Sequence, residues 1–556
     1  MLSIQPRQTH SMWTRDGVRL DADVYYPDAE GLFPVLLMRQ PYGRAIASTI
    51  VYAHPQWYAA HGYIVVIQDV RGRGTSEGVF DLFAHEVNDG EDTVRWAAAL
   101  SGSDGQVGMY GFSYQGMTQL YAAQSQPAAL KTVAPAMTGY HLFEDWAYEN
   151  GAFCFQLGLM WALQLAAETA RIELNVSRYQ SLLKAARDLP VWDTVPAQPD
   201  VLSGVDSFFH DWVSCAATDS YWQVRLPQLQ DVDLPMLHVG GWFDPYLRGD
   251  VRLYREMARR SQQLHHLWIG PWGHIPWGRK VGSIDFGAAA MSPIDAVQIA
   301  WFDAVLKGKE RAALRASPSV RLFEMGVNQW RTVDRWPDLA CKDVTGKVYA
   351  LASSGISNIR EDSGVLLDLL ATECEALDRE VRQDVVVHDP WNPVPALGGH
   401  SAIPSGSFDR TAIDLRGDVL TYTTQPLAER LRVAGVIEFI GAIASTTPSY
   451  DLCAVVSRVT AGKAFNLTQG YCKVEPVQVV TSHLVSLRLH PTCFNLFPGE
   501  RLRLSLSAAC FPAYPINPGT GTSLKEIRLI DAQIITLSVT TGGEQGARLK
   551  LPVMMD

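Results

Sequence analysis

The sequence contains no apolar run that approaches the ~20 residues of a membrane-spanning helix. Its first residues, MLSIQPRQTHSMWTRDG, also lack the apolar core of a secretory signal peptide. Basic runs are missing as well, and the formal net charge is -11. That charge argues against nucleic acid or an anionic membrane surface as a partner. We therefore expect a cytoplasmic protein with neither kind of partner.

Signatures of metal and phosphate binding are also absent. The eight cysteines are scattered without C-x-x-C spacing, which argues against a zinc site and indicates reduced, mostly buried thiols. The segment Gly72 to Gly78 (GRGTSEG) is rich in glycine but lacks the G-K-[ST] ending of a phosphate-binding loop. We expect no metal and no cofactor.

What the chain does have is the bulk and composition of a multidomain globular protein. It has 556 residues, of which 47% are hydrophobic and 19% charged, as in ordinary globular proteins. A chain of this length is too long for one core and predicts two to four domains. No internal repeat or low-complexity linker marks where they meet.

The stretch Val107 to Ala123 (VGMYGFSYQGMTQLYAA) predicts a strand, a sharp turn and a helix, with Ser113 at the apex. Gly111 and Gly116 would let neighbouring elements approach this strained turn. Ser113 is therefore a candidate nucleophile. The spacing is G-x-S-x-x-G, because Gln115 stands where the general elbow has its second glycine, so a surface serine in a glycine turn is the alternative.

Buried strands and helices alternate in the first part of the chain. Pro34 to Arg39, Tyr63 to Gln68 and Lys131 to Met137 are short apolar runs separated by helical patterns. This alternation indicates a parallel sheet covered on both faces. Ligands of such sheets bind beyond the carboxyl ends of the strands, which is where Tyr42 and Ser113 fall.

Residues 140–232 show helical patterns and no clear buried strand, which predicts a helical cap over the active edge of the sheet. Strands return at Leu234 to Gly240 and His266 to Gly270, and these lead to Asp244 and His274. A neutral serine needs a base within hydrogen-bond reach and a carboxylate that holds the base in the right tautomer. The order Ser113, Asp244, His274 is that of α/β-hydrolases. Taken one at a time, Asp244 could simply form a turn and His274 could be an ordinary loop histidine.

A set of ordered motifs extends over most of the chain: PYGR (41–44), DVRGRGTSEG (69–78), GMYGFSYQG (108–116), GGWFDPY (240–246), GPWGH (270–274), WFDAVLKG (301–308), EMGVNQWR (324–331) and DPWNPVPALGG (389–399). In these motifs the chain resembles the CocE/NonD hydrolases, which are relatives of X-Pro dipeptidyl-peptidases and α-amino-acid ester hydrolases. The elbow of that family is similar to G-x-S-Y-x-G, which accommodates Gln115.

The resemblance implies an α/β-hydrolase core, an inserted helical cap and a C-terminal β jelly roll. It also implies that Ser113 is the nucleophile, Asp244 the acid and His274 the base. The hydroxyl of Tyr42 and the backbone N–H of Tyr114 would then form the oxyanion hole. From about residue 347 the sequence independently shows many short strands separated by turn residues, as in a sandwich or jelly roll. A carbohydrate-binding role is the alternative for that region.

We expect four segments: residues 1–139 and 233–340 as the two parts of the core, 140–232 as the cap and 341–556 as the jelly roll. Tyr246, Trp146 and Trp161 are candidates for an aromatic lining of the acyl pocket, although tryptophans more often belong to the core. Cys215 stands where family members often have a histidine, which leaves the choice of substrate open.

The combined prediction is a serine hydrolase, an esterase or acylase, that cleaves a carboxylic ester or amide of a small molecule through an acyl-enzyme. An X-Pro dipeptidyl-peptidase and an α-amino-acid ester or β-lactam acylase are alternatives within the same family. A non-catalytic descendant that binds a small molecule or a partner is an alternative of a different class. The oligomeric state stays open, a homo-oligomer included.

Overall fold

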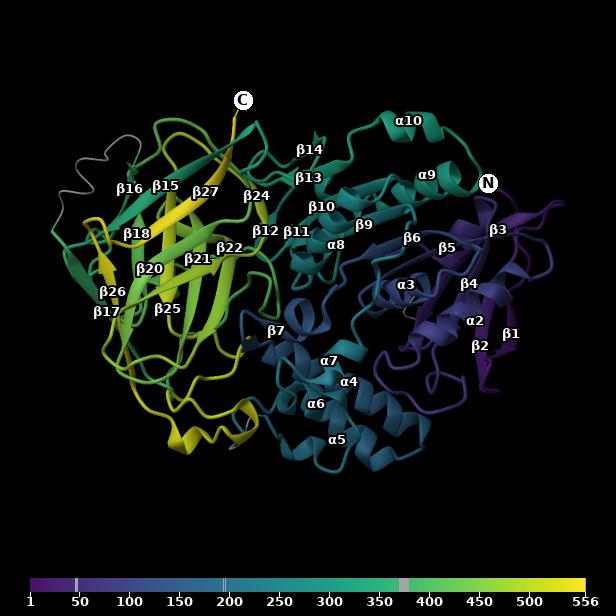
Figure 1. Ribbon diagram of the computed structural model, residues 1–556, viewed down its shortest axis with the longest axis horizontal. Helices are drawn as coiled ribbons and strands as arrows, with labels where there is room; N and C mark the ends of the chain where they lie inside the picture. The colour runs from purple at the N-terminus through teal and green to yellow at the C-terminus, as the bar shows by residue number, and fades with distance from the viewer. Residues whose placement is uncertain (46–48, 194, 196, 370–379, 556) are drawn as a thin grey trace.

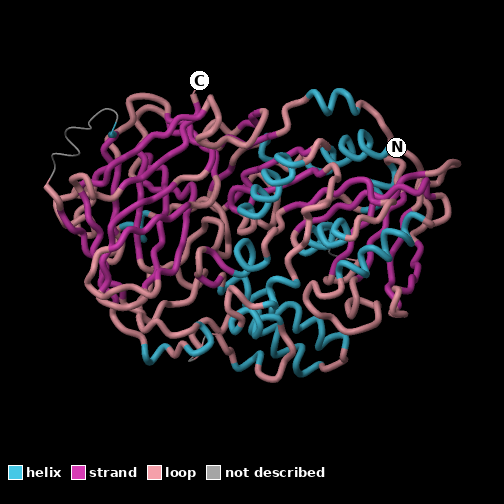
Figure 2. The backbone as a smooth tube through the Cα atoms, viewed as in Figure 1, coloured by secondary structure: helices cyan, strands magenta, loops and turns pink. Residues whose placement is uncertain are grey.

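The computed structural model describes residues 1–45, 49–193, 195, 197–369 and 380–555. Two large sheets dominate this part of the chain, and a group of helices lies beside them (Figure 1). Residues 8–333 include the strands of the first sheet, which helices cover. Residues 344–554 include the strands of the second sheet, and this part of the chain has almost no helix (Figure 2).

The first sheet has ten strands in the order β1-β2-β4-β3-β5-β6-β9-β10-β13-β14. From β4 through β3 to β13 neighbouring strands are parallel, and the outermost pairs are antiparallel. The strands are β1 (Gln8–Trp13), β2 (Arg19–Tyr25), β3 (Phe33–Gln40), β4 (Ile64–Asp69), β5 (Ser103–Phe112), β6 (Leu130–Ala136), β9 (Met236–Phe243), β10 (His265–Gly273), β13 (Val320–Glu324) and β14 (Gln329–Val333). The predicted parallel sheet is confirmed.

Helices cover both faces of this sheet because its central strands are apolar on both faces. Along β3, Val35 and Leu37 belong to one core cluster and Leu36 and Met38 to another, as the two-residue period of a strand requires. The helices α2 (Glu86–Ala98) and α3 (Tyr114–Gln124) contribute to the first cluster, and α1 (Pro55–Ala60) and α9 (Ile294–Leu306) to the second. Burying one such aliphatic side chain is worth about 1.5–3 kcal/mol.

A helical region lies between β6 and β9. Its elements are η2 (Leu142–Ala147), β7 (Tyr148–Glu149), β8 (Ala152–Phe153), α4 (Phe155–Ile172), α5 (Val176–Arg187), η3 (Asp200–Leu202), α6 (Phe208–Ser214) and α7 (Ser220–Val224). The expected helices are present, but the hairpin of β7 and β8 was not expected. Its turn is Asn150-Gly151 with φ of 43° and 83°, the residue pair that favours a tight type I′ hairpin.

The second sheet has thirteen strands within the described residues and is almost entirely antiparallel; β16 and β18 pair in parallel. The strands are β15 (Val344–Ala352), β16 (Val365–Asp368), β17 (Arg382–His388), β18 (Leu420–Thr423), β19 (Leu431–Gly435), β20 (Glu438–Ser445), β21 (Tyr450–Thr460), β22 (Lys463–Val474), β23 (His483–Arg488), β24 (Thr492–Leu496), β25 (Arg501–Ser507), β26 (Ile535–Thr541) and β27 (Arg548–Met554). The predicted β-rich character of this part is confirmed.

The seven cysteines of the described residues are free thiols, and five of them are buried. Cys374 lies outside the described residues. Among the helices that can be described, none is both long and apolar enough to cross a membrane.

Candidate active site

Ser113 occupies a strained turn between a strand and a helix. β5 ends at Phe112 and α3 begins at Tyr114, so Ser113 is the single residue that joins them. Its φ of 61° and ψ of -128° are rare for a residue with a side chain, and such a conformation costs about 1–3 kcal/mol. Its backbone is held on both sides, because its N–H donates to Ala136 O and its carbonyl accepts the N–H groups of the next helical turn.

The glycines beside Ser113 are required by close packing. A Cβ at Gly111, where φ is +141°, would lie 2.5 Å from Cβ of Gln115. A Cβ at Gly116 would lie 2.8 Å from Cβ of Thr138. Both distances are shorter than real contacts allow, so the turn that presents Ser113 depends on these two glycines.

Asp244 and His274 follow directly after two adjacent parallel strands. β9 ends at Phe243 and β10 at Gly273, and these two end residues are partners in the sheet register. Asp244 and His274, the residues that follow these two strand ends, therefore lie side by side. His274 Nδ1 is 2.7 Å from Asp244 Oδ1, so an Nδ1–H donates to the carboxylate and Nε2 keeps its lone pair.

The carboxylate of Asp244 is oriented from several directions. Its side chain is fully buried, whereas that of His274 is 25% exposed. The second carboxylate oxygen accepts the backbone N–H of Tyr246 at 3.1 Å. A buried carboxylate with two hydrogen-bond donors is fixed in position, and the imidazole on the solvent side takes its orientation from it.

Ser113, Asp244 and His274 lie at the same edge of the sheet. β5, β6, β9 and β10 are consecutive parallel neighbours, so all their carboxyl ends point the same way. The ring of Phe112, the residue before Ser113, lies 5.4 Å from the imidazole of His274.

Tyr42 lies just after β3, and its hydroxyl accepts a hydrogen bond from Trp161 Nε1 at 3.1 Å. Burial raises the pKa of the Tyr42 phenol, and this outweighs the lowering effects of hydrogen bonding with Trp161 and Ser113 and of the charge of Arg73. The phenol therefore keeps its proton at neutral pH and remains a donor close to Ser113.

Tyr114 can contribute only through its backbone. Its side-chain hydroxyl donates to Glu86 at 2.7 Å, in the interior of the α/β part. As the first residue of α3, Tyr114 has an N–H with no acceptor in its own helix. That N–H is one residue beyond Ser113, where the fold commonly supplies an oxyanion donor.

The three aromatic candidates form one continuous row with the histidine. Tyr246 packs edge-on against His274 with ring centroids 5.1 Å apart. Trp146 lies 4.3 Å from Tyr246 and stacks on Trp161 at 5.4 Å. The row therefore runs from His274 to Trp161, which in turn contacts Tyr42. Trp146 and Tyr246 are buried, and Trp161 is partly buried.

A buried polar cluster behind Asp244 was not predicted from the sequence. His490 Nε2–H donates to the backbone carbonyl of Asp244 at 2.9 Å, and the ring of His490 stacks on His400 at 3.9 Å. His400 Nε2 is 2.8 Å from Glu149, which also pairs with Arg248 at 2.8 Å. Burial favours the neutral form of Glu149, but the charges of Arg248 and His400 lower its pKa overall. Burial lowers the pKa of His490, which is therefore neutral and donates from Nε2 alone.

No group of three or more His, Cys, Asp or Glu side chains in the described ranges is arranged to hold a metal ion.

Comparison with known proteins places this site in a family. Residues 16–276 match the model of the X-Pro dipeptidyl-peptidase S15 family, and residues 312–544 match the X-Pro dipeptidyl-peptidase C-terminal non-catalytic domain. The chain is 30% identical to the cocaine esterase of Rhodococcus sp. (strain MB1 Bresler) over 97% of both chains. The chain belongs to the CocE/NonD family of hydrolases.

Solved structures agree with the fold of the CocE/NonD family. An aminopeptidase from a marine sediment Thaumarchaeota archaeon superposes with a TM-score of 0.81 and 23% identity, over 99% of this chain and 96% of that one. An α-amino acid ester hydrolase gives 0.77 and 23%, over 98% and 96%. A CocE/NonD family hydrolase from Staphylococcus aureus gives 0.70 and 15%, over 99% and 93%. This CocE/NonD protein thus has an α/β-hydrolase-type fold followed by a β-rich C-terminal domain.

Proposed function

We propose that this chain is a serine hydrolase that cleaves a carboxylic ester or amide bond of a small molecule through an acyl-enzyme. The observation that carries the proposal is the 2.7 Å contact between His274 Nδ1 and buried Asp244, at the same sheet edge as the strained turn of Ser113. A hydrogen-bonded imidazole and carboxylate beside an elbow serine are what acyl transfer requires.

In the proposed reaction, Ser113 Oγ attacks the carbonyl carbon while His274 Nε2 accepts the hydroxyl proton. Asp244 stabilises the imidazolium that forms. The imidazolium then donates that proton to the leaving alcohol or amine as the bond to it breaks. Water repeats the two steps on the acyl-enzyme, releases the acid and restores Ser113.

The oxyanion would be held by the Tyr42 hydroxyl and the Tyr114 N–H. One such donor is typically worth about 2.7–4 kcal/mol of barrier. The raised pKa of Tyr42 supports this role, because only the protonated phenol can donate. The contact with Trp161 supports it too, since Trp161 donates to the phenol oxygen and leaves the phenol hydrogen for a ligand.

We propose the helical region as a cap over this edge and the C-terminal β domain as a jelly roll, with boundaries near residues 139, 232 and 340. Tyr246, Trp146 and Trp161 would line the acyl side of the site beneath the cap, which favours an aromatic or bulky acyl group. Cytoplasmic location and assembly into a homo-oligomer stay predictions.

The relatives support two substrate classes. The similarity to a cocaine esterase over nearly the whole chain favours small esters. The match to the X-Pro dipeptidyl-peptidase model favours peptides or aminoacyl substrates as the second candidate. We place esters first because the relative that aligns at 30% identity over 97% of this chain is an esterase.

A fluorophosphonate probe and a panel of aryl, alkyl and aminoacyl esters, amides and β-lactams test the proposal. We expect the wild-type protein to be labelled and to turn over at least one substrate, and Ser113→Ala to lose both while it keeps its melting temperature. A folded wild-type protein that is neither labelled nor active would instead support a non-catalytic binding protein.

A further inference from the structure

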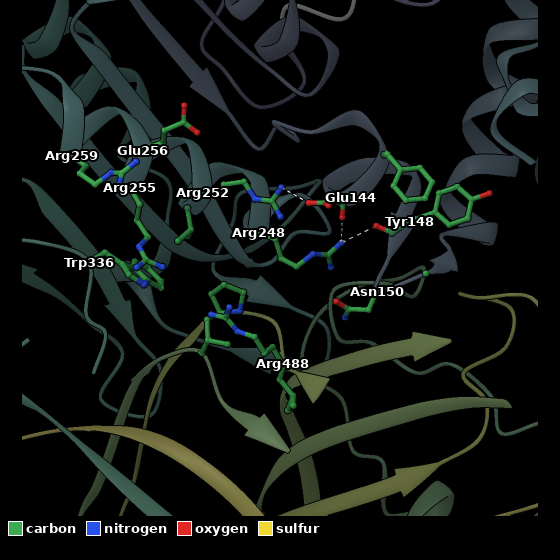
Figure 3. A pocket seen from close by; sticks show the side chains of 16 residues that line it. Glu144, Tyr148, Asn150, Arg248, Arg252, Arg255, Glu256, Arg259, Trp336 and Arg488 are labelled. Atoms are coloured by element: carbon green, nitrogen blue, oxygen red, sulfur yellow. Dashed lines mark hydrogen bonds and ion pairs between the residues drawn. The ribbon is translucent and has the colours of Figure 1, made fainter. Parts of the chain in front are cut away.

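A cavity of about 720 Å³ lies outside the proposed active site, and none of the triad residues lines it. One wall is the helix α8 (Leu247–Arg260), and another is the segment from Phe143 to Gly151. The remaining wall comes from residues at and beyond 336, including the end of β23 (Figure 3). The volume is in the range of small-molecule sites.

Five arginines line this cavity and give it a positive charge. Four of them are spaced by four, three and four residues along α8, which places them on one face of the helix. The fifth is the last residue of β23 and extends toward them from the opposite wall (Figure 3). The five are Arg248, Arg252, Arg255, Arg259 and Arg488. Among the described residues that line it, two are acidic, Glu144 and Glu256, although the chain as a whole carries a net charge of -11.

Arg252 and Arg255 already take part in ion pairs. Arg255 pairs with Asp338 at 3.0 Å, and these side chains are 47% and 34% exposed. Arg252 pairs with exposed Glu144 at 2.6 Å and with buried Asp145 at 3.3 Å. The pairs with exposed Glu144 and with Asp338 are weak, and each guanidinium has five N–H donors, of which these contacts use few.

Two of the arginines are wholly available. Arg259 and Arg488 are exposed, and their guanidinium groups have no ion-pair or hydrogen-bond partner among the described residues. Arg248 differs from both, because it is held by buried Glu149 and so forms part of the wall. Two free guanidinium groups on opposite walls can reach one ligand from two sides.

We propose that this cavity binds a small organic polyanion, a molecule with at least two phosphate or carboxylate groups on an apolar body. Guanidinium groups bind both kinds of anion through paired N–H donors. Phe143, Tyr148 and Trp336 supply apolar surface for the rest of the molecule. The concave shape and the acidic character of the whole chain favour a small molecule over a nucleic acid.

Isothermal titration calorimetry at low ionic strength tests the proposal, with pyrophosphate and citrate as the two probes. We expect saturable binding of one probe per chain to the wild-type protein. Arg488→Glu and Arg259→Glu should each weaken it about tenfold or more, because a charge-assisted contact is replaced by a repulsion. Arg501→Glu is the matched control: Arg501 is an exposed arginine of the same β domain that does not line the cavity.

Binding to Ser113→Ala should equal that to the wild-type protein, so failure of the proposed hydrolase chemistry would not affect this result. The tighter of the two probes identifies phosphate or carboxylate as the preferred group. Absence of saturable binding by both probes would overturn the proposal. Equal weakening in Arg501→Glu would overturn it as well, because the effect would then be one of total charge.

Discussion

Replacing Tyr42 by Phe removes one hydroxyl group and leaves the ring in place, so it isolates the proposed oxyanion donor. Loss of one preorganised donor costs about 2.7–4 kcal/mol of barrier, or roughly 10²–10³-fold in kcat. KM should change little, because the donor acts on charge that develops in the transition state. The folded state loses the hydrogen bond from Trp161, a cost to the free energy of unfolding of about 0.5–1.5 kcal/mol.

The assay is steady-state hydrolysis of the best ester substrate, with thermal unfolding measured on the same samples. Trp161→Phe is the matched control, since it removes the same hydrogen bond from the donor side but leaves the phenol of Tyr42. We expect Trp161→Phe to be destabilised at least as much as Tyr42→Phe, because it also loses ring contacts with Trp146 and Phe208. Only Tyr42→Phe should lose two or more orders of magnitude in kcat. Activity of Tyr42→Phe within a few-fold of wild type would refute the oxyanion role.

Three further predictions follow from the site and its surroundings. Asp244→Asn should lower kcat about 10³–10⁴-fold with the fold intact, because an amide next to His274 Nδ1 favours the wrong tautomer; unchanged kcat would contradict the triad. Gly116→Ala should lower the free energy of unfolding by about 1–3 kcal/mol, because the new Cβ meets Thr138, and urea unfolding that matches wild type would contradict this reading. Burial lowers the pKa of His266 to about 4, below its unfolded value of about 6.5. Its contribution to stability is therefore present above pH 6.5 and is lost as pH falls toward 4. Urea unfolding of wild type and His266→Phe should show a smaller loss on acidification in the variant, and identical losses would exclude this histidine.

The positions of Ser113, Asp244 and His274 could be predicted because each follows an apolar strand, and strand order fixes which ends are neighbours. The ends of two strands could not be predicted. The prediction ended them at Gly240 and Gly270, whereas the strands continue to Phe243 and Gly273. These glycines lie inside strands for reasons of packing.

A Cβ at Gly240 would lie 2.6 Å from Leu247, and a Cβ at Gly270 would lie 2.4 Å from the ring of Trp272. Which side chain packs against a glycine inside a strand depends on the folded state, so the sequence pattern does not reveal it. The hairpin at Asn150-Gly151 did carry a local signal, but its strands are only two residues long and show no alternation.

The polar cluster behind Asp244 could not be predicted for a different reason. Glu149 and His400 are 251 positions apart, and His490 and Asp244 are 246 apart. No periodicity or spacing links residues at such distances. The same holds for the arginine-lined cavity, in which Arg488 faces a helix that ends at Arg260.

Through the cluster of Glu149, His400 and His490, the β domain supplies hydrogen bonds to the region behind Asp244. It could therefore not be replaced by an unrelated domain. A protein cut before residue 341 would keep Glu149 and Arg248. It would lose His400 and Tyr514, which both hydrogen-bond to Glu149, and also the donor to the Asp244 carbonyl, His490. Glu149 would then face water where it now faces His400 and Tyr514. Grafting a foreign domain at this junction would succeed only if that domain brought equivalent donors to the same places.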